Sequence, residues 1–117
     1  MNIRKLLYLT AAIASAVTVS FAVPNGAKDK DSGTVFVGDI SDSMCGLQHP
    51  LADKKRCTLG CVKGFDGTTF VLADQEHKKV YNLSNQKKAK AFAGEKVEVR
   101  GTLNGDTIQV ISIKAAQ

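Results

Sequence analysis

The sequence predicts an all-β domain, a small barrel of five strands with one or two short helices. Three observations support this fold class. Short runs in which apolar and polar side chains alternate recur after residue 33, as in half-buried strands. Turn signals separate these runs, Asp66-Gly67 and Asn104-Gly105 being the clearest. The chain of 117 residues has room for one domain.

The N-terminus, residues 1–22, has the layout of a secretory signal peptide. Arg4 and Lys5 form a positive region, an uncharged apolar stretch follows, and Ser20 and Ala22 are the small residues of a cleavage site. We therefore expect a periplasmic or secreted protein. An uncleaved N-terminal anchor is the alternative, because the apolar stretch is close to the length of a membrane span.

Removal of residues 1–22 would leave 95 of the 117 residues and lower the formal net charge from +5 to +3. Residues 23–32 contain Pro, Gly and charged side chains without hydrophobic periodicity, so we expect a flexible leader there. The domain then comprises residues 33–117. A core of this size is small, and a crosslink or a bound metal would add useful stability.

Five segments have the alternation and the β-branched residues of strands. They are residues 33–40, 68–74, 79–83, 95–103 and 106–114. In the first segment, Val35 and Val37 share one face, and Phe36 and Ile40 lie near the other. The polar loop between the second and third segments contains His77, which we expect to be exposed.

The last two segments form a predicted hairpin, because Asn104-Gly105 between them is the strongest short-range hairpin signal in the chain. In the final segment Ile108 and Val110 share a face. Ile111 and Ile113 are spaced so that the apolar side chains change from this face of the strand to the other.

Two short helices are expected between the strands. Pro50 can begin a helical turn and Gly64 can end one in the left-handed conformation, which predicts a helix within residues 51–63. In residues 84–94 the apolar period changes to that of a helix, with Ser84 as the expected N-cap.

Five strands with a helix between the third and the fourth is the element order of the OB-fold, a partly open Greek-key barrel. Closure suits a small domain because it hides sheet edges. We therefore predict an OB-fold-like barrel with an insert, residues 41–64, between its first two strands.

The insert contains all three cysteines of the chain and one of its two histidines. On a helix, Cys57 and Cys61 would be neighbours on one face with Cβ atoms ~5–6 Å apart. A disulfide needs a shorter separation, so both sulfurs would point at a common partner. Cys45 and His49 are the candidates, and we expect Asp42 to cap the turn that precedes them.

Three chemistries are open at this cluster. Cys45, His49, Cys57 and Cys61 match the donor types of zinc and of Cu(I) sites. In an oxidising compartment a disulfide from Cys45 to Cys57 or Cys61 is also open, and it would leave one thiol. A redox-active thiol, activated by His49 or by the basic residues 54–56, is the third.

The segments GDISDSMCGLQH, CTLGCV, VYNLSNQ and VRGTLNGDTIQVISI resemble a family of small exported bacterial proteins of unknown function, predicted to adopt OB-like barrels. The likeness covers about residues 33–113. It implies an exported OB-like domain and no particular activity. Five residues match the family pattern D-S-x-C-G-x-x-H followed by C-T-x-x-C, namely Asp42, Cys45, His49, Cys57 and Cys61.

The remaining composition disfavours several function classes. The sequence has no GxSxG, phosphate-binding loop, HExxH or CxxC motif, which argues against an enzyme. It has no Trp and few aromatics, which argues against stacking on nucleic acid, and no membrane segment after residue 22. We expect a monomeric binding or structural module with a transition-metal site for zinc or copper. The alternatives are a disulfide-stabilised module that binds a polymer or protein partner without metal, and a thiol redox protein.

Overall fold

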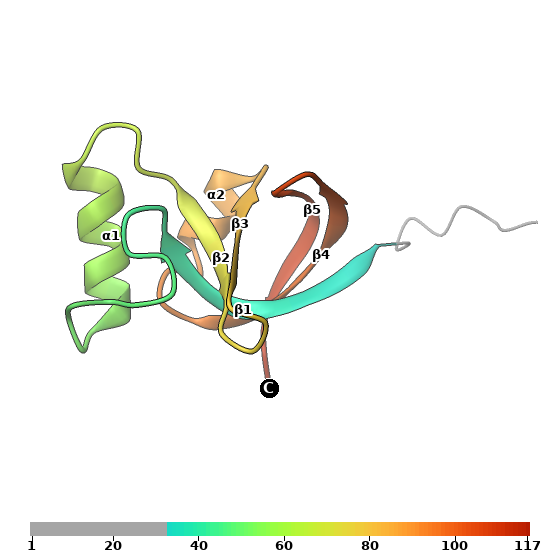
Figure 1. The fold of residues 1–117 in the computed structure, drawn as a ribbon, viewed down its shortest axis with the longest axis horizontal. Coiled ribbons are helices and arrows are strands. Elements are labelled where there is room, and N and C mark those ends of the chain that lie inside the picture. Colours follow the sequence, from blue (N-terminus) through green and yellow to red (C-terminus); the bar gives the residue numbers. More distant parts are fainter. Residues whose placement is uncertain (1–32) are drawn as a thin grey trace, which may run out of the picture.

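The computed structural model describes residues 33–117, so the predicted signal peptide and leader lie outside the described residues. The described chain forms five strands and two helices (Figure 1). Their bounds are β1 Thr34–Asp42, α1 Lys54–Gly64, β2 Phe70–Asp74, β3 Lys79–Leu83, α2 Gln86–Lys90, β4 Lys96–Asn104 and β5 Thr107–Ala115. Between residues 33 and 117, neither helix has the length and apolar character needed to cross a membrane.

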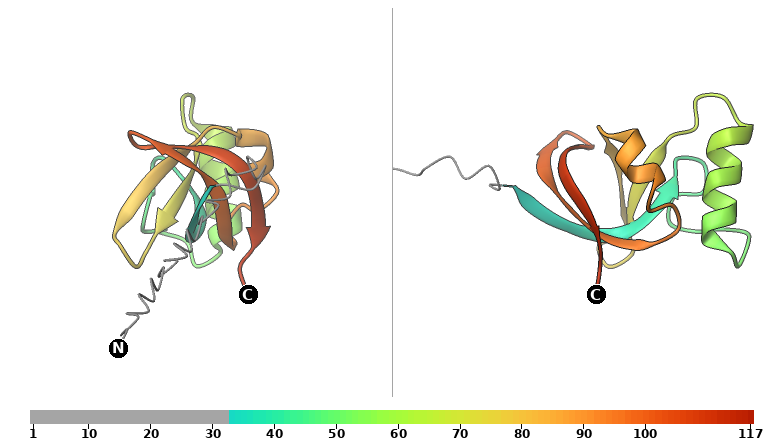
Figure 2. Two further views of the ribbon diagram at one scale, coloured as in Figure 1. Left: turned by 90° about the vertical axis from the view of Figure 1, so that its right-hand side faces the viewer. Right: turned by 180° about the vertical axis from the view of Figure 1, so that it is seen from behind.

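The strands form one mixed sheet that closes in a ring, in the order β1-β2-β3-β5-β4 (Figure 2). Most neighbouring strands are antiparallel, but β3 and β5 run parallel. This parallel contact has only two residue pairs, Asn82 with Thr107 and Leu83 with Ile108, so the ring is not a regular barrel. The mostly-β class, the five strands and the helix between the third and fourth strands are confirmed.

The core fills the ring, because inward side chains alternate with outward ones along each strand. On β1, Val35 and Val37 are exposed on the outer face, whereas Ile40 is fully buried and Phe36 packs against the core, as the alternation predicts. The buried residues of this core are Ile40, Phe70, Leu72, Leu83, Ala89, Ala93, Val97, Val99 and Ile108.

A bulge in β5 explains why its apolar residues change spacing. Val99 of β4 pairs with Ile113, but Gly101 pairs with Val110, so β5 has one extra residue between them. Ile108, Val110 and Ile113 can then all contact the core despite their odd spacing. Gly101 is required opposite the bulge, because a side chain there would collide with the backbone of Gln109.

The helix ends differ from the predicted ones. α2 is capped by Asn85, whose Oδ1 accepts from Lys88 N at 2.9 Å, and not by Ser84, whose Oγ accepts from Val110 N at 2.8 Å. α1 begins after Asp53 rather than at Pro50, because the Asp53 carboxylate accepts from Arg56 N at 3.0 Å.

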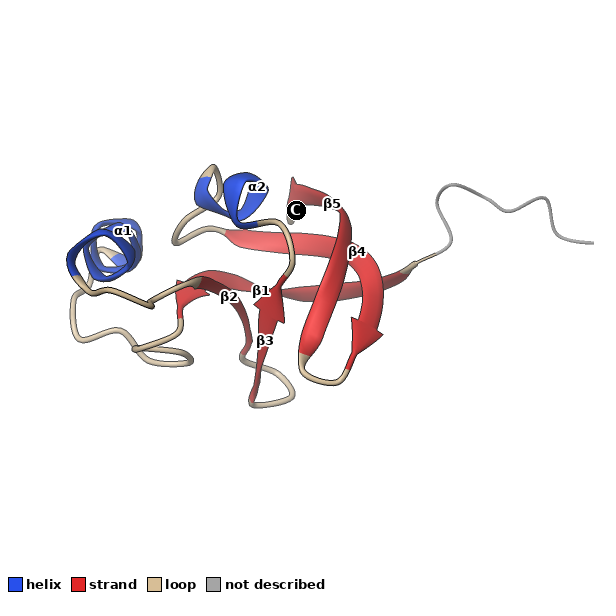
Figure 3. Cartoon of the chain, turned by 90° about the horizontal axis from the view of Figure 1, so that it is seen from above, coloured by secondary structure: helices blue, strands red, loops and turns tan. Residues whose placement is uncertain are grey.

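The C-terminal end of α1 also differs from the prediction. Gly64 is the last helical residue and does not have a positive φ. Phe65, in extended backbone, closes the helix by donating its N–H to Cys61 O at 3.1 Å. α1 stands outside the ring beside the end of β1, whereas α2 lies against β2 (Figure 3).

Candidate metal centre

The turn after β1 positions the first cysteine. β1 continues through Ser41 and Asp42, two residues beyond its predicted end. Asp42 Oδ1 accepts from Met44 N at 3.1 Å and from Cys45 N at 2.8 Å, and Asp42 O accepts from Gly46 N at 2.8 Å. This confirms the predicted cap, and the turn directs Cys45 towards α1.

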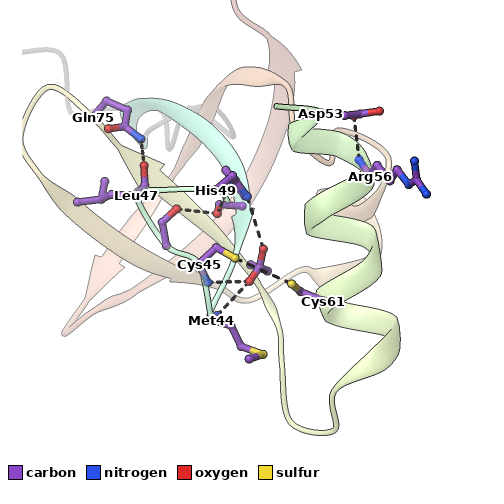
Figure 4. A network of polar contacts seen from close by, with 11 residues as sticks. Met44, Cys45, Leu47, His49, Asp53, Arg56, Cys61 and Gln75 are labelled. Atoms are coloured by element: carbon purple, nitrogen blue, oxygen red, sulfur yellow. Dashed lines mark hydrogen bonds and ion pairs between the residues drawn. The ribbon is translucent and has the colours of Figure 1, made fainter. Parts of the chain in front are cut away.

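α1 supplies the other two sulfurs. Cys57 and Cys61 lie one turn apart on the helix, as predicted, and Cys57 is buried. Figure 4 shows Cys61 facing Cys45, with 3.9 Å between their sulfurs. The sulfurs of all three cysteines lie within 4.8 Å of one another. All three fall in the described part of the chain and all are free thiols, so no disulfide is formed there.

Contacts with the loop before β4, with β1 and with the core hold α1 beside the turn that contains Cys45. Gly94, in the loop before β4, has φ +75°, and a Cβ there would collide with the backbone of Lys55 in the first turn of α1. Lys54 Nζ lies 3.2 Å from Asp39 Oδ2 of β1. Leu59 and Val62 of α1 pack against the core. The two helical sulfurs are therefore held in a fixed place relative to the sheet.

His49 lies on the other side of Cys45, within a hydrogen-bonded network. Its Nε2 is 3.0 Å from Ser41 Oγ, and Ser41 Oγ donates to Gly46 O at 2.7 Å. Its Nδ1 is buried without a hydrogen-bond partner. Asp42 Oδ2, also buried and unpartnered, lies 3.9 Å from that nitrogen.

Two groups of donors could therefore hold a metal ion. One comprises Cys45, Cys57 and Cys61, and the other comprises Asp42, Cys45 and His49. The groups share Cys45 and no other residue. The structure thus brings His49 together with Asp42, whereas the sequence pattern predicts it beside the helical cysteines. The spacing D-x-x-C-x-x-x-H is the signal that identifies Asp42 as part of a site.

The surroundings of Cys45 and Cys61 disfavour their thiolate forms in the absence of a cation. Burial raises the pKa of Cys45 to about 12, helped by the hydrogen bond with the Cys61 thiol and by the charge of Asp42. Burial also raises the pKa of Cys61. Reactive cysteines have lowered pKa values, so these shifts disfavour a redox-active thiol at Cys45 and at Cys61.

His77 of the β2–β3 loop belongs to a second acid–histidine pair, which is part of neither donor group. Its Nδ1 lies 2.7 Å from Asp74 Oδ2, and its side chain is 68% exposed, which confirms the predicted exposure. At an exposed pair of this kind water would compete with the side chains for a cation, unlike at the buried pair of Asp42 and His49.

No protein-family model, no curated protein and no solved structure matches the chain.

Proposed function

We propose that this protein is a small module that binds a transition-metal ion, zinc or copper, through the three-cysteine group. The observation that carries the proposal is the convergence of Cys45, Cys57 and Cys61, whose sulfurs lie within 4.8 Å of one another although they come from a turn and a helix. Thiolates suit both Zn²⁺ and Cu(I). A cysteine group that uses all three sulfurs also accounts for their odd number.

The site would act as a clamp between α1 and the sheet. Cys45 lies in the turn after β1, whereas Cys57 and Cys61 belong to α1, which stands outside the ring (Figure 1). An ion bound to all three would join the helix to the strand. Metal binding of this type contributes directly to the free energy of folding, which matters most in a small domain.

Other features extend the proposal beyond the site. The strand order β1-β2-β3-β5-β4, with α2 between β3 and β4, supports an OB-like barrel. The sequence of residues 1–22 supports export to the periplasm or beyond. The resemblance of residues 33–113 to the family of small exported bacterial proteins agrees with both.

One other function has an observation in its favour. The 3.9 Å between the sulfurs of Cys45 and Cys61 makes this pair a candidate for a disulfide, so an oxidised protein would be stapled there and have no three-thiolate site. That protein would bind a polymer or a protein partner through the sheet and use no metal.

Intact mass, thiol titration and metal analysis on protein purified from its export compartment separate the two functions. Stoichiometric zinc or copper, lost in Cys45→Ser and retained in the control Ser43→Ala, is the expected result. A mass lower by two hydrogens, one titratable thiol and no metal would refute the proposal and support the staple. Three free thiols that take up neither Zn²⁺ nor Cu(I) would refute both functions.

A further inference from the structure

We propose that the site holds two cations rather than one, with the Cys45 thiolate as the bridge between them. The second cation would lie between Asp42, Cys45 and His49. This inference rests on the proposed function, because Cys45 is a ligand in both groups. It assigns Asp42 and His49 to a cation of their own.

The hydrogen bonds around His49 leave a nitrogen lone pair directed at a carboxylate. Ser41 has one hydroxyl hydrogen, and Gly46 O, at 2.7 Å, can only accept it. Ser41 Oγ must then accept from His49 Nε2, which therefore carries the ring proton. In neutral His49 the unpartnered Nδ1 has the lone pair, and it lies 3.9 Å from the unpartnered Asp42 Oδ2.

Two acceptors that face each other in a buried place leave each other without a partner, and a cation between them would supply one. The Asp42 side chain is fully buried and that of His49 is 6% exposed, so water cannot readily satisfy either atom. At 3.9 Å the gap exceeds a direct hydrogen bond. It is compatible with one ion that contacts both, since zinc lies about 2.0–2.2 Å from nitrogen and oxygen ligands. Cys45 provides the third donor.

The donor atoms form two groups rather than one as the side chains lie. Two sulfur ligands of one zinc ion are at most about 4.6 Å apart, twice the zinc–sulfur distance. The ligand atoms of Asp42, Cys45 and His49 all lie within 4.8 Å of one another, whereas His49 is not in the group with Cys57 and Cys61. Two ions that share Cys45 use every donor in its present position.

Charge balance leads to the same count. Three thiolates and the Asp42 carboxylate carry four negative charges between them. One divalent ion would leave two of those charges uncompensated in a largely buried site, which is costly. Two divalent ions neutralise the set, with His49 neutral. The second group, with nitrogen and oxygen donors, suits Zn²⁺ better than Cu(I).

Zn²⁺ titration of the full mature chain, read as bound metal per chain after gel filtration, tests this inference. We expect two ions in the wild-type protein and one in Asp42→Asn. The Asn side chain keeps an oxygen to cap the turn but replaces the second oxygen with an amide that does not bind the ion. His49→Gln should also bind one ion, and Cys45→Ser should lose both. Asp74→Asn, in the exposed acid–histidine pair, is the matched control and should bind two.

A second readout keeps the inference testable if a variant folds poorly. With ¹¹³Cd²⁺ as the probe, the wild-type protein should give two NMR resonances, one typical of a sulfur-rich site and one of a mixed site. One ion per chain with a single resonance, unaffected by Asp42→Asn, would overturn the second site but leave the proposed function intact. A wild-type protein that binds no Zn²⁺, Cd²⁺ or Cu(I) would overturn both, whereas one that binds Cu(I) alone would overturn only the second site.

Discussion

Substitution of Gly94 by alanine tests how α1 is held over the sheet. Gly94 combines two constraints, a φ of +75° and a close approach to the backbone of Lys55. Gly105, in the β4–β5 hairpin, has a similar φ of +60°, but a Cβ added there would have nothing within 4 Å. The pair Gly94→Ala and Gly105→Ala therefore separates the cost of the backbone conformation from the cost of displacing the helix.

The expected losses in free energy of unfolding are the cost of the left-handed backbone conformation and the cost of the steric overlap with α1. Alanine in the left-handed conformation costs about 1–2 kcal/mol, which applies to both variants. Overpacking adds about 1–3 kcal/mol, and it applies only to Gly94→Ala, because the obstructing atoms of Lys55 are backbone and cannot rotate away. The free energy of unfolding should fall by about 2–5 kcal/mol in Gly94→Ala and by about 1–2 kcal/mol in Gly105→Ala.

Urea unfolding measured by circular dichroism gives both values, and Zn²⁺ affinity gives a second comparison. Because α1 carries two of the three sulfurs, Gly94→Ala should also weaken Zn²⁺ binding, whereas Gly105→Ala should leave it unchanged. Equal losses of stability in the two variants would refute the argument that the first turn of α1 rests on Gly94.

Three other predictions concern hydrogen bonds and titration. Gln86→Ala should lower the free energy of unfolding by about 1–3 kcal/mol, because the Gln86 carboxamide makes three hydrogen bonds to the backbone of β2 and β3; urea unfolding checks this, and a loss no larger than that of Gln75→Ala, which removes one exposed hydrogen bond, would contradict it. Asp53→Ala should cost about 1 kcal/mol through the N-cap of α1, and Asp53→Ser should recover most of it in thermal unfolding. The hydrogen bond that the His77 ring donates to the Asp74 carboxylate raises the pKa of His77 above the ordinary 6.5, so the pair stabilises the fold below that pH and its contribution fades as the pH rises through the raised value. Burial opposes ionisation of Asp74, but its hydrogen bonds with His77 outweigh burial and lower the pKa of Asp74, so the contribution is also lost on acidification below the ordinary aspartate range. NMR titration of the His77 ring should show the raised pKa, and Asp74→Asn should remove the shift; a shift that persists would have another cause.

The elements of the fold could be predicted because the signals that mark them are local. The alternation in β1, the hairpin at Gly105 and the i, i+4 cysteines of α1 each depend on a few neighbouring residues. Helix ends were harder to predict, since they depend on distant partners. Ser84 is a good cap by residue type, but its hydroxyl accepts from Val110, which is far along the chain, so Asn85 caps α2 instead.

The residues of the candidate site could be predicted from the sequence, but their division into two donor groups could not. Residue type and spacing identify the three cysteines and His49, and they indicate that Cys45 meets the helical pair. They do not show which way the His49 ring faces, because the Ser41–Gly46 hydrogen bond sets that orientation. Nor do they show that Asp42, whose one oxygen caps the turn, has a second oxygen left buried and unpartnered.

Asp42 links the shape of the turn to the chemistry of the site. Its Oδ1 holds the backbone N–H of Cys45, which fixes where that sulfur lies, and its Oδ2 faces His49. A bound cation at Oδ2 would therefore order the same turn that presents Cys45 to α1. Since the three-cysteine group needs Cys45 in that position, occupation of one group should favour occupation of the other. Binding of two ions to the wild-type protein should accordingly be cooperative. Asp42→Asn should abolish binding of the second ion and also lower the affinity of the three cysteines for the first.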